Sequence, residues 1–215
     1  MINRKGALLL CCLAILGGCA SHANIEMPAV TQVYNNAFTN KTFSYEILYS
    51  QPKPGIFSGG DKMPLLPLEK SEMSIASAAT LKNLPDYIYK QLPSSVIRDQ
   101  SGNGDFKLIV ELTAYNKKGP AYSDYEFAKS FGKNLLTFGF ASSEYNIIAN
   151  FDAKYRLIRS GEEIFTKNYK VSESVDHERG DFDSFNTLND YSGQLLEKHL
   201  ILTLNDFFKE ATVNM

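Results

Sequence analysis

Along residues 144–159, every second side chain is apolar, and most of the side chains between them are polar. The apolar members of this stretch are Tyr145, Ile147, Ala149, Phe151, Ala153, Tyr155 and Leu157. Because successive side chains of a strand point to opposite faces, a period of two predicts a long strand with one buried and one solvated face. A tight turn at 159–162 follows, and 164–172 is expected to return as the hairpin partner. The chain therefore builds a sheet that needs a second layer on one face.

Two other segments show the same period of two, at 42–50 and at 106–115. Both are predicted to be strands with one buried face. The segment 30–34 is a candidate for a short edge strand. Between 51 and 67 the chain is too rich in proline and glycine for a regular element. That loop is interpreted either as a binding flap or, in the favoured reading, as a loop that packs its apolar residues onto the core.

Two segments have the spacing of amphipathic helices, with apolar residues that recur every three or four positions. The first is 71–92, where Pro85 predicts a kink or a fresh start. The second is 186–211, whose wide apolar face has to lie across a sheet. The predicted fold class is α+β, a two-layer sandwich with an antiparallel sheet of about four strands and two helices on one face. Residues 42–215 are expected to form a single domain.

The first 19 residues have the layout of a secretory signal peptide. Arg4 and Lys5 precede an apolar run, which is too short to span a bilayer, and small residues follow it. Leu16-Gly17-Gly18-Cys19 resembles the lipobox of bacterial lipoproteins. The resemblance implies cleavage after residue 18, attachment of palmitate-type acyl chains at Cys19, and anchoring in a membrane. The alternative is ordinary signal cleavage around 20–23.

The residues after Cys19 carry two further expectations. No Asp follows the cysteine, and the sorting rule of enterobacterial lipoproteins then implies release to the outer membrane. Residues 19–41 are predicted to be a lipidated N-terminus and a polar tether that keeps the domain close to the membrane. The chain layout over 42–211 also resembles that of envelope lipoproteins, including lipopolysaccharide-assembly lipoproteins and the auxiliary lipoproteins of lipid-transport ABC systems. That resemblance carries over no functional residues.

Charge and cysteine content exclude several classes of protein. All three cysteines lie at or before position 19, so the mature domain has no disulfide framework and depends on its core. Once the signal peptide is removed, 20 basic residues remain against 24 acidic ones. With no long basic run, binding to nucleic acid is not expected.

No catalytic or metal-binding pattern stands out. His22, His177 and His199 lack partners at metal-ligand spacing, and His199 is expected to be a boundary residue with one satisfied nitrogen. The acidic run 176–183 could supply calcium ligands, but it lacks EF-hand spacing and is predicted to be a solvated turn. The chain has no GxSxG motif or phosphate-binding loop. The sequence therefore predicts a protein that is not an enzyme and that needs no cofactor or metal.

The excursion 115–143 between two predicted strands is the best candidate for a binding site. It mixes aromatic residues with lysines, as a surface for a lipid or a protein partner would. The candidate residues are Tyr122, Tyr125, Lys129, Phe131, Lys133, Phe138 and Phe140. The alternative is that this excursion only caps the open end of the core.

Three functions fit these patterns. The first is a non-enzymatic outer-membrane lipoprotein on the periplasmic face, an accessory or scaffold in envelope assembly or lipid transport. Its partners would be the membrane and an envelope protein or lipid. The second is an immunity lipoprotein that occludes a periplasmic effector, with 176–183 as its contact surface. The third is a lipid-anchored hydrolase, which would need a buried ionisable cluster around His199.

Overall fold

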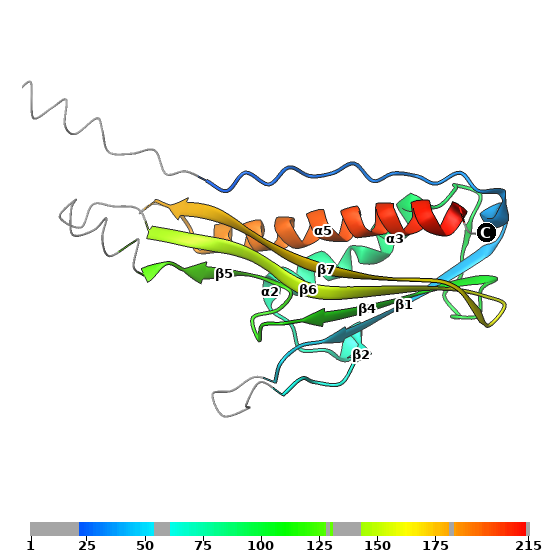
Figure 1. Cartoon of the computed structure of the whole chain (residues 1–215), viewed down its shortest axis with the longest axis horizontal. Helices are drawn as coiled ribbons and strands as arrows, with labels where there is room; N and C mark the ends of the chain where they lie inside the picture. Colours follow the sequence, from blue (N-terminus) through cyan, green and yellow to red (C-terminus); the bar gives the residue numbers. More distant parts are fainter. Residues whose placement is uncertain (1–21, 54–60, 128–129, 131–142, 181–182, 214–215) are drawn as a thin grey trace, which may run out of the picture.

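The computed structural model describes residues 22–53, 61–127, 130, 143–180 and 183–213. Over these residues, one mixed seven-stranded sheet carries three α-helices on one face, so the α+β class is confirmed (Figure 1). Residues 36–38 and 68–70 form short 3-10 helices. The other face of the sheet is not covered by a helix in the described part of the chain.

The four predicted strands are present. They are β1 (Thr42–Ser50), β4 (Phe106–Ala114), β6 (Ser143–Arg159) and β7 (Glu162–Arg179). The apolar side of β6 faces the helices as predicted, with Tyr145 half-buried and the other members buried. The β6–β7 hairpin forms at the expected turn, where Ser160 and Gly161 both have positive φ. β7 runs seven residues beyond the predicted end of that strand.

The sheet has seven strands, so the prediction of about four was wrong. Two additional strands, β2 (Leu66–Pro67) and β3 (Ile97–Arg98), are two residues long and pair with opposite ends of β1. The third, β5 (Ala121–Tyr125), lies inside the predicted excursion and pairs with the first part of β6. Elements this short have too few residues to show a hydrophobic period, which explains why they were missed.

The expectation of an antiparallel sheet was also wrong at two pairs, because β1 is parallel both to the short β3 and to β4. β1 and β4 are parallel, in register from Phe43 opposite Phe106 to Ser50 opposite Thr113. Parallel neighbours need a long crossover connection, and here it contains α2 (Ile75–Lys82) and α3 (Leu84–Gln91). The predicted helix is thus the crossover of a β-α-β unit.

The helical layer follows the predicted pattern. The break near Pro85 is confirmed: α2 ends at Lys82, and α3 begins at Leu84 with this proline in its first turn. The side chain of Ser74 caps α2 by accepting a hydrogen bond from the backbone N–H of Ser77. The last helix, α5 (Asn186–Val213), has 28 residues and lies across the sheet, as its apolar face requires.

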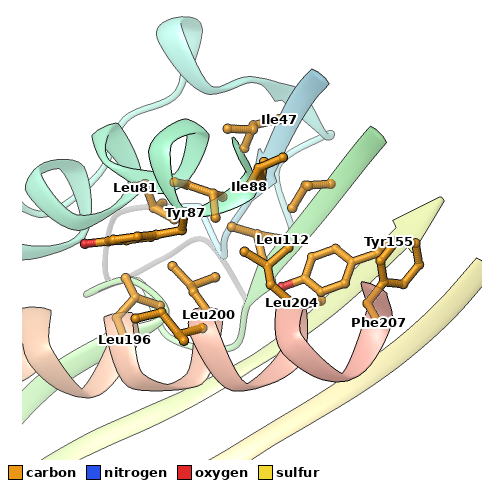
Figure 2. Packing of buried hydrophobic residues seen from close by; sticks show 14 of the residues in the cluster. Ile47, Leu81, Tyr87, Ile88, Leu112, Tyr155, Leu196, Leu200, Leu204 and Phe207 are labelled. Carbon is orange, nitrogen blue, oxygen red and sulfur yellow. The ribbon is translucent and has the colours of Figure 1, made fainter. Parts of the chain in front are cut away.

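The core lies between α5, the α2–α3 pair and the inner face of the sheet. Figure 2 shows Leu196, Leu200 and Leu204 of α5 beneath α2 and α3, close to Leu112 of β4. All four leucines are fully buried. Burying a leucine is worth roughly 1.5–3 kcal/mol, so this contact supplies much of the folding free energy.

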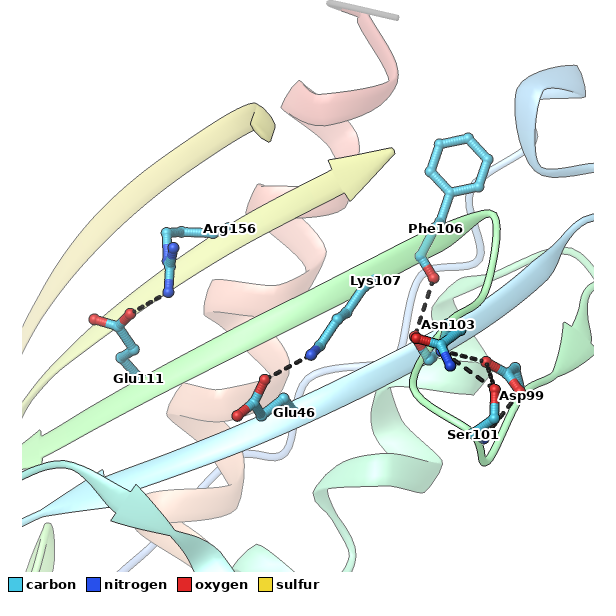
Figure 3. Close-up of polar contacts among 9 residues, drawn as sticks. Glu46, Asp99, Ser101, Asn103, Phe106, Lys107, Glu111 and Arg156 are labelled. Atoms are coloured by element: carbon cyan, nitrogen blue, oxygen red, sulfur yellow. Dashed lines mark hydrogen bonds and ion pairs between the residues drawn. The ribbon is translucent and has the colours of Figure 1, made fainter. Parts of the chain in front are cut away.

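The uncovered face of the sheet carries a ladder of ion pairs. Lys107 of β4 lies 2.7 Å from Glu46 of β1, and Arg156 of β6 lies 2.7 Å from Glu111 of β4 (Figure 3). These cross-strand pairs join neighbouring strands on the solvated side. These partly buried pairs therefore link β1, β4 and β6 on the face that no described helix covers.

Residues 22–41, the described part of the predicted tether, pack against the folded body. Residues 30–34 form no strand, and the chain from 22 onward is extended against the folded body rather than projecting from it as a polar tether. Ala23 and Val33 are buried, and Phe38 is fully buried beside Phe106. Tertiary contacts therefore hold a segment whose own sequence has no periodic pattern.

Candidate functional site

The N-terminal segment 22–35, called the strap below, runs alongside α5 for nearly the length of that helix (Figure 1). At its start, the backbone N–H of Ala23 donates a hydrogen bond of 3.1 Å to Nδ1 of His177. At its end, the side chain of Asn35 donates to the carbonyl of Thr212 in the last turn of α5. The strap therefore connects the two ends of the domain.

Asn205 of α5 fixes the middle of the strap. Its Nδ2 donates to the carbonyl of Ala29 at 2.8 Å, and its Oδ1 accepts from the backbone N–H of Thr31 at 2.9 Å. The same Oδ1 accepts from the side chain of Gln91 in α3. Because an extended segment beside a helix has few backbone partners, one side-chain amide that bonds both strap positions sets its place along α5.

His177 accepts the hydrogen bond from Ala23 and is almost fully buried. Its ring lies 4.6 Å from the ring of Tyr191 in α5 and 5.5 Å from that of His22, centroid to centroid. Burial lowers the pKa of His177, and the neighbouring His22 lowers it further, while Asp183 and Glu178 act in the opposite direction. An Nδ1 that accepts a hydrogen bond carries no proton, so docking of the strap uses the neutral ring.

The solvated turn predicted for 176–183 is wrong for its first half. Residues 176–179 continue β7, and His177 pairs across the sheet with Tyr145 of β6. Within the second half, Gly180 donates its backbone N–H to the Asp183 carboxylate, and 181–182 lie outside the described residues. Sequence reasoning therefore missed His177, although its position among alternating residues after 164 was a usable signal.

Aromatic side chains gather at the end of the sheet where the strap begins. We call this group, Tyr125, Phe127, Tyr145, His177 and Phe185, the aromatic end. The ring of Tyr125 lies 5.2 Å from that of Tyr145 and 6.5 Å from that of Phe127, centroid to centroid. Phe127 is 68% exposed and Tyr125 is 45% exposed. Phe185 is also exposed, and the guanidinium of Arg179 stacks 3.8 Å from its ring centre.

The predicted site residues fall into two groups. Tyr122 and Tyr125 lie on β5, and Tyr122 borders a hollow of about 260 Å³ between β5, α2 and α5, with Lys118 beside its ring. The other candidates lie outside the described residues, as does the lipidation candidate. These are Cys19, Lys129, Phe131, Lys133, Phe138 and Phe140.

The loop 51–67 is partly described. Residues 54–60 lie outside the described part, and the remainder is paired to itself and to β1. Pro52 bridges Lys62, the backbone N–H of Met63 donates to the carbonyl of Gln51, and Leu66 continues into β2. The described part of this loop therefore lies along the sheet edge with Leu65 exposed, and Ile56 and Phe57 lie outside the described residues, so the choice between a flap and a loop packed on the core stays a prediction.

Three ionisable side chains lie close together at His199. Nε2 of His199 lies 2.7 Å from Glu173 of β7, and Nζ of Lys198 lies 2.7 Å from the same carboxylate. Burial lowers the pKa of His199 despite this carboxylate, and the cluster ties α5 to the edge strand. Among the described residues, no group of three metal-ligating side chains is close enough to hold an ion. That the protein is not an enzyme stays a prediction from the sequence.

Two larger hollows, of about 390 Å³ each, lie elsewhere on the surface. One is on the uncovered sheet face, beside Asp152 and Lys154, and the other is next to Tyr89 and Arg98. Both are open and lined by ion-paired or stacked groups.

None of the described helices has the length and apolar character needed to cross a bilayer.

Comparisons with known proteins give only remote structural likeness. No protein-family model and no curated protein matches the sequence. Among solved structures, a minor lipoprotein of Acinetobacter baumannii is 14% identical, with a TM-score of 0.34 over 81% of this chain and 94% of that one. The rare lipoprotein B of Shewanella oneidensis is 10% identical, with a TM-score of 0.32 over 80% of this chain and 94% of that one.

A Xanthomonas campestris protein of the DUF330 family is 12% identical, with a TM-score of 0.35 over 89% of this chain and 97% of that one. At these scores and identities the likeness assigns neither a shared fold nor a function. Bacterial lipoproteins are thus among the structures that this chain remotely resembles, and no family is assigned to it.

Proposed function

We propose that the protein is a lipoprotein of the bacterial envelope, anchored through Cys19 in the outer membrane and facing the periplasm. Its role is that of a non-enzymatic accessory or scaffold in envelope assembly or lipid transport. The observation that supports this proposal is that two features lie next to each other in the chain. A lipobox-like sequence ends at Cys19, and the chain is fixed to the folded body from Ala23 onward.

The geometry supports a scaffold role because the anchor and the body are closely connected. An acylated Cys19 would lie only four residues before Ala23, whose backbone is held by His177. Two or three acyl chains hold a protein on a bilayer far more firmly than one chain does. A body joined so closely to its anchor presents a defined surface to other envelope components.

The anchor is tested by the mass of the mature protein isolated from membranes. We expect an N-terminal Cys19 that carries acyl chains, and recovery with the outer membrane after separation of the two envelope membranes. Cys19→Ser should abolish acylation and membrane recovery. Cys12→Ser, a matched change in the same apolar run, should leave both unchanged. An unmodified mature N-terminus between residues 20 and 23 would contradict the proposal.

The role is tested by what remains bound when the intact protein is cross-linked in its own membrane and then purified. Lipid, or a component of an assembly or transport system, is the expected product. A secreted toxic effector would support the immunity alternative instead. Absence of both a membrane partner and co-purifying lipid would count against the accessory role.

A further inference from the structure

We infer that the aromatic end is the surface with which the folded body rests on the lipid bilayer, with Tyr125 and Phe127 at the level of the head groups. This inference rests on the proposed acyl anchor at Cys19 and adds to it an orientation and a contact surface. It depends on three observations: the short reach of the chain before the strap, the exposure of the aromatic residues, and the side from which the chain leaves the body.

The reach of the chain limits how far the aromatic end can be from the membrane. Ala23 is fixed to His177, and Cys19 precedes it by four positions. A fully extended chain covers at most about 3.6 Å per residue, so Cys19 lies within about 14 Å of Ala23. The opposite end of the domain lies a full helix away, and the 28 residues of α5 are about 42 Å long. The anchor can therefore bring the aromatic end to the bilayer and leave the other end in solution.

The exposed side chains at this end have the chemistry of a membrane interface. Tyr125 combines an apolar ring with a polar hydroxyl, the kind of side chain that is enriched at head-group level. Phe127 and Phe185 are more exposed than Tyr125, at 68% and 62%. Arg179 stacks on Phe185 and keeps a cation beside an apolar ring, which suits contact with both phosphate and acyl chain.

The two sides of the sheet differ at this end. Tyr125, Tyr145 and His177 are opposite one another across β5, β6 and β7, so their side chains share one face. The adjacent row carries Asp124 and Asp176 on the other face. The strap leaves from the aromatic face, because Ala23 bonds to the His177 ring. That face is the one that α5 covers further along the sheet, so when this end rests on the bilayer the aromatic rings and the strap lie on one side of the sheet and the carboxylates on the other.

The chain contains no tryptophan, so a single introduced tryptophan reports its own surroundings. Phe127→Trp places the reporter at the aromatic end. Tyr34→Trp is the matched control, because Tyr34 is 87% exposed and lies at the far end, next to the bond between Asn35 and Thr212. Both acylated full-length proteins are reconstituted into phosphatidylcholine vesicles in which part of the lipid carries brominated acyl chains. Flotation confirms that each protein is bound.

In floated vesicles the Phe127→Trp protein should lose much of its fluorescence to the bromines and shift its emission to the blue. The Tyr34→Trp protein should keep its fluorescence and remain open to a water-soluble quencher. Phe185→Trp provides a second reporter at the aromatic end, should the first variant fold poorly, and should behave like Phe127→Trp.

Four results would overturn the inference. If the variants float but neither reporter at the aromatic end is quenched, the anchor stands and the contact surface is wrong. If Tyr34→Trp is quenched equally, the body lies flat. If the reporter of the Phe127→Trp protein is shielded only in native membranes that contain partner proteins, the surface belongs to a protein. A protein that carries no acyl chain and does not float would refute the proposed anchor as well, which separates the two failures.

Discussion

The backbone N–H of Ala23 donates a hydrogen bond to Nδ1 of His177 across a sequence separation of 154 residues. It joins the start of the described chain to the last residues of β7. The geometry of this bond determines where the chain that precedes the domain leaves the folded body. It also makes the attachment depend on the protonation state of one histidine.

Acidification should release the start of the strap. Burial lowers the pKa of folded His177, so as the pH falls below about 6.5, the ordinary histidine value, the strap-released and unfolded states bind the proton first. The stabilisation from this bond is therefore complete above that pH and decreases below it. Hydrogen exchange of the Ala23 amide, measured across this range, should show the loss of protection.

His177→Gln is the control for this pH effect, because the glutamine oxygen can still accept from Ala23 but does not titrate. The acid-dependent loss of protection between about pH 6.5 and 5 should disappear in this variant. Hydrogen bonds lower the pKa of Asp99 and of Asp105, so these carboxylates take up protons only at lower pH. The same pH profile in His177→Gln and in the unchanged protein would disprove the role of this ring.

Asn205→Ala should loosen the strap and destabilise the domain. The change removes two bonds to the strap and one to Gln91, and it leaves backbone groups without partners. We expect a loss of about 1–3 kcal/mol in the free energy of unfolding and faster proteolysis within 22–35. Asn189→Ala, at an exposed position of the same helix, should change neither measurement. Unchanged proteolysis of Asn205→Ala would mean that the strap is held by other contacts.

Gly193→Ala tests the close approach of α5 to α2. A methyl group on Gly193 would lie 3.1 Å from the hydroxyl of Thr80, which also donates to the Gly193 carbonyl at 3.2 Å. In an open helix this substitution would stabilise by roughly 0.5–1 kcal/mol. We expect Gly193→Ala to give no such stabilisation when Thr80 is present. In a Thr80→Ala background, the same substitution should give it. Equal effects in both backgrounds, in a double-mutant cycle of chemical denaturation, would contradict the contact.

Tyr155→Phe tests a polar contact in the core. The hydroxyl of Tyr155 lies 2.8 Å from that of Thr203, both are buried, and burial raises the pKa of Tyr155. Thr203 also donates to the carbonyl of His199 in its own helix, so it keeps a partner after the change. The loss in the free energy of unfolding should be about 1 kcal/mol, measured by urea titration. A loss of several kcal/mol would indicate that the tyrosine hydroxyl holds more than this one bond.

The elements with a sustained period were predictable from the sequence. The alternation of 144–159 and the apolar face of 186–211 each require burial of one side, and both formed where expected. The α+β class and the break at Pro85 follow from the same local information, because the spacing of apolar residues and the geometry of proline act over a few residues.

Tertiary structure alone determined the direction of β1 against β4, the pairing of β5 inside the excursion and the course of the strap. The reason is that these features depend on partners far away in the chain. Whether two strands are parallel or antiparallel depends on the path that the chain takes between them. The strap, which is extended, has no regular repeat of apolar residues that could predict its course. The sequence by itself predicted a signal peptide, a lipobox-like cysteine and an aromatic excursion. Only the fold brought the start of the strap, through His177, to the same end of the sheet as Tyr125 and Phe127, because strand register across β5, β6 and β7 aligns residues that no local pattern connects.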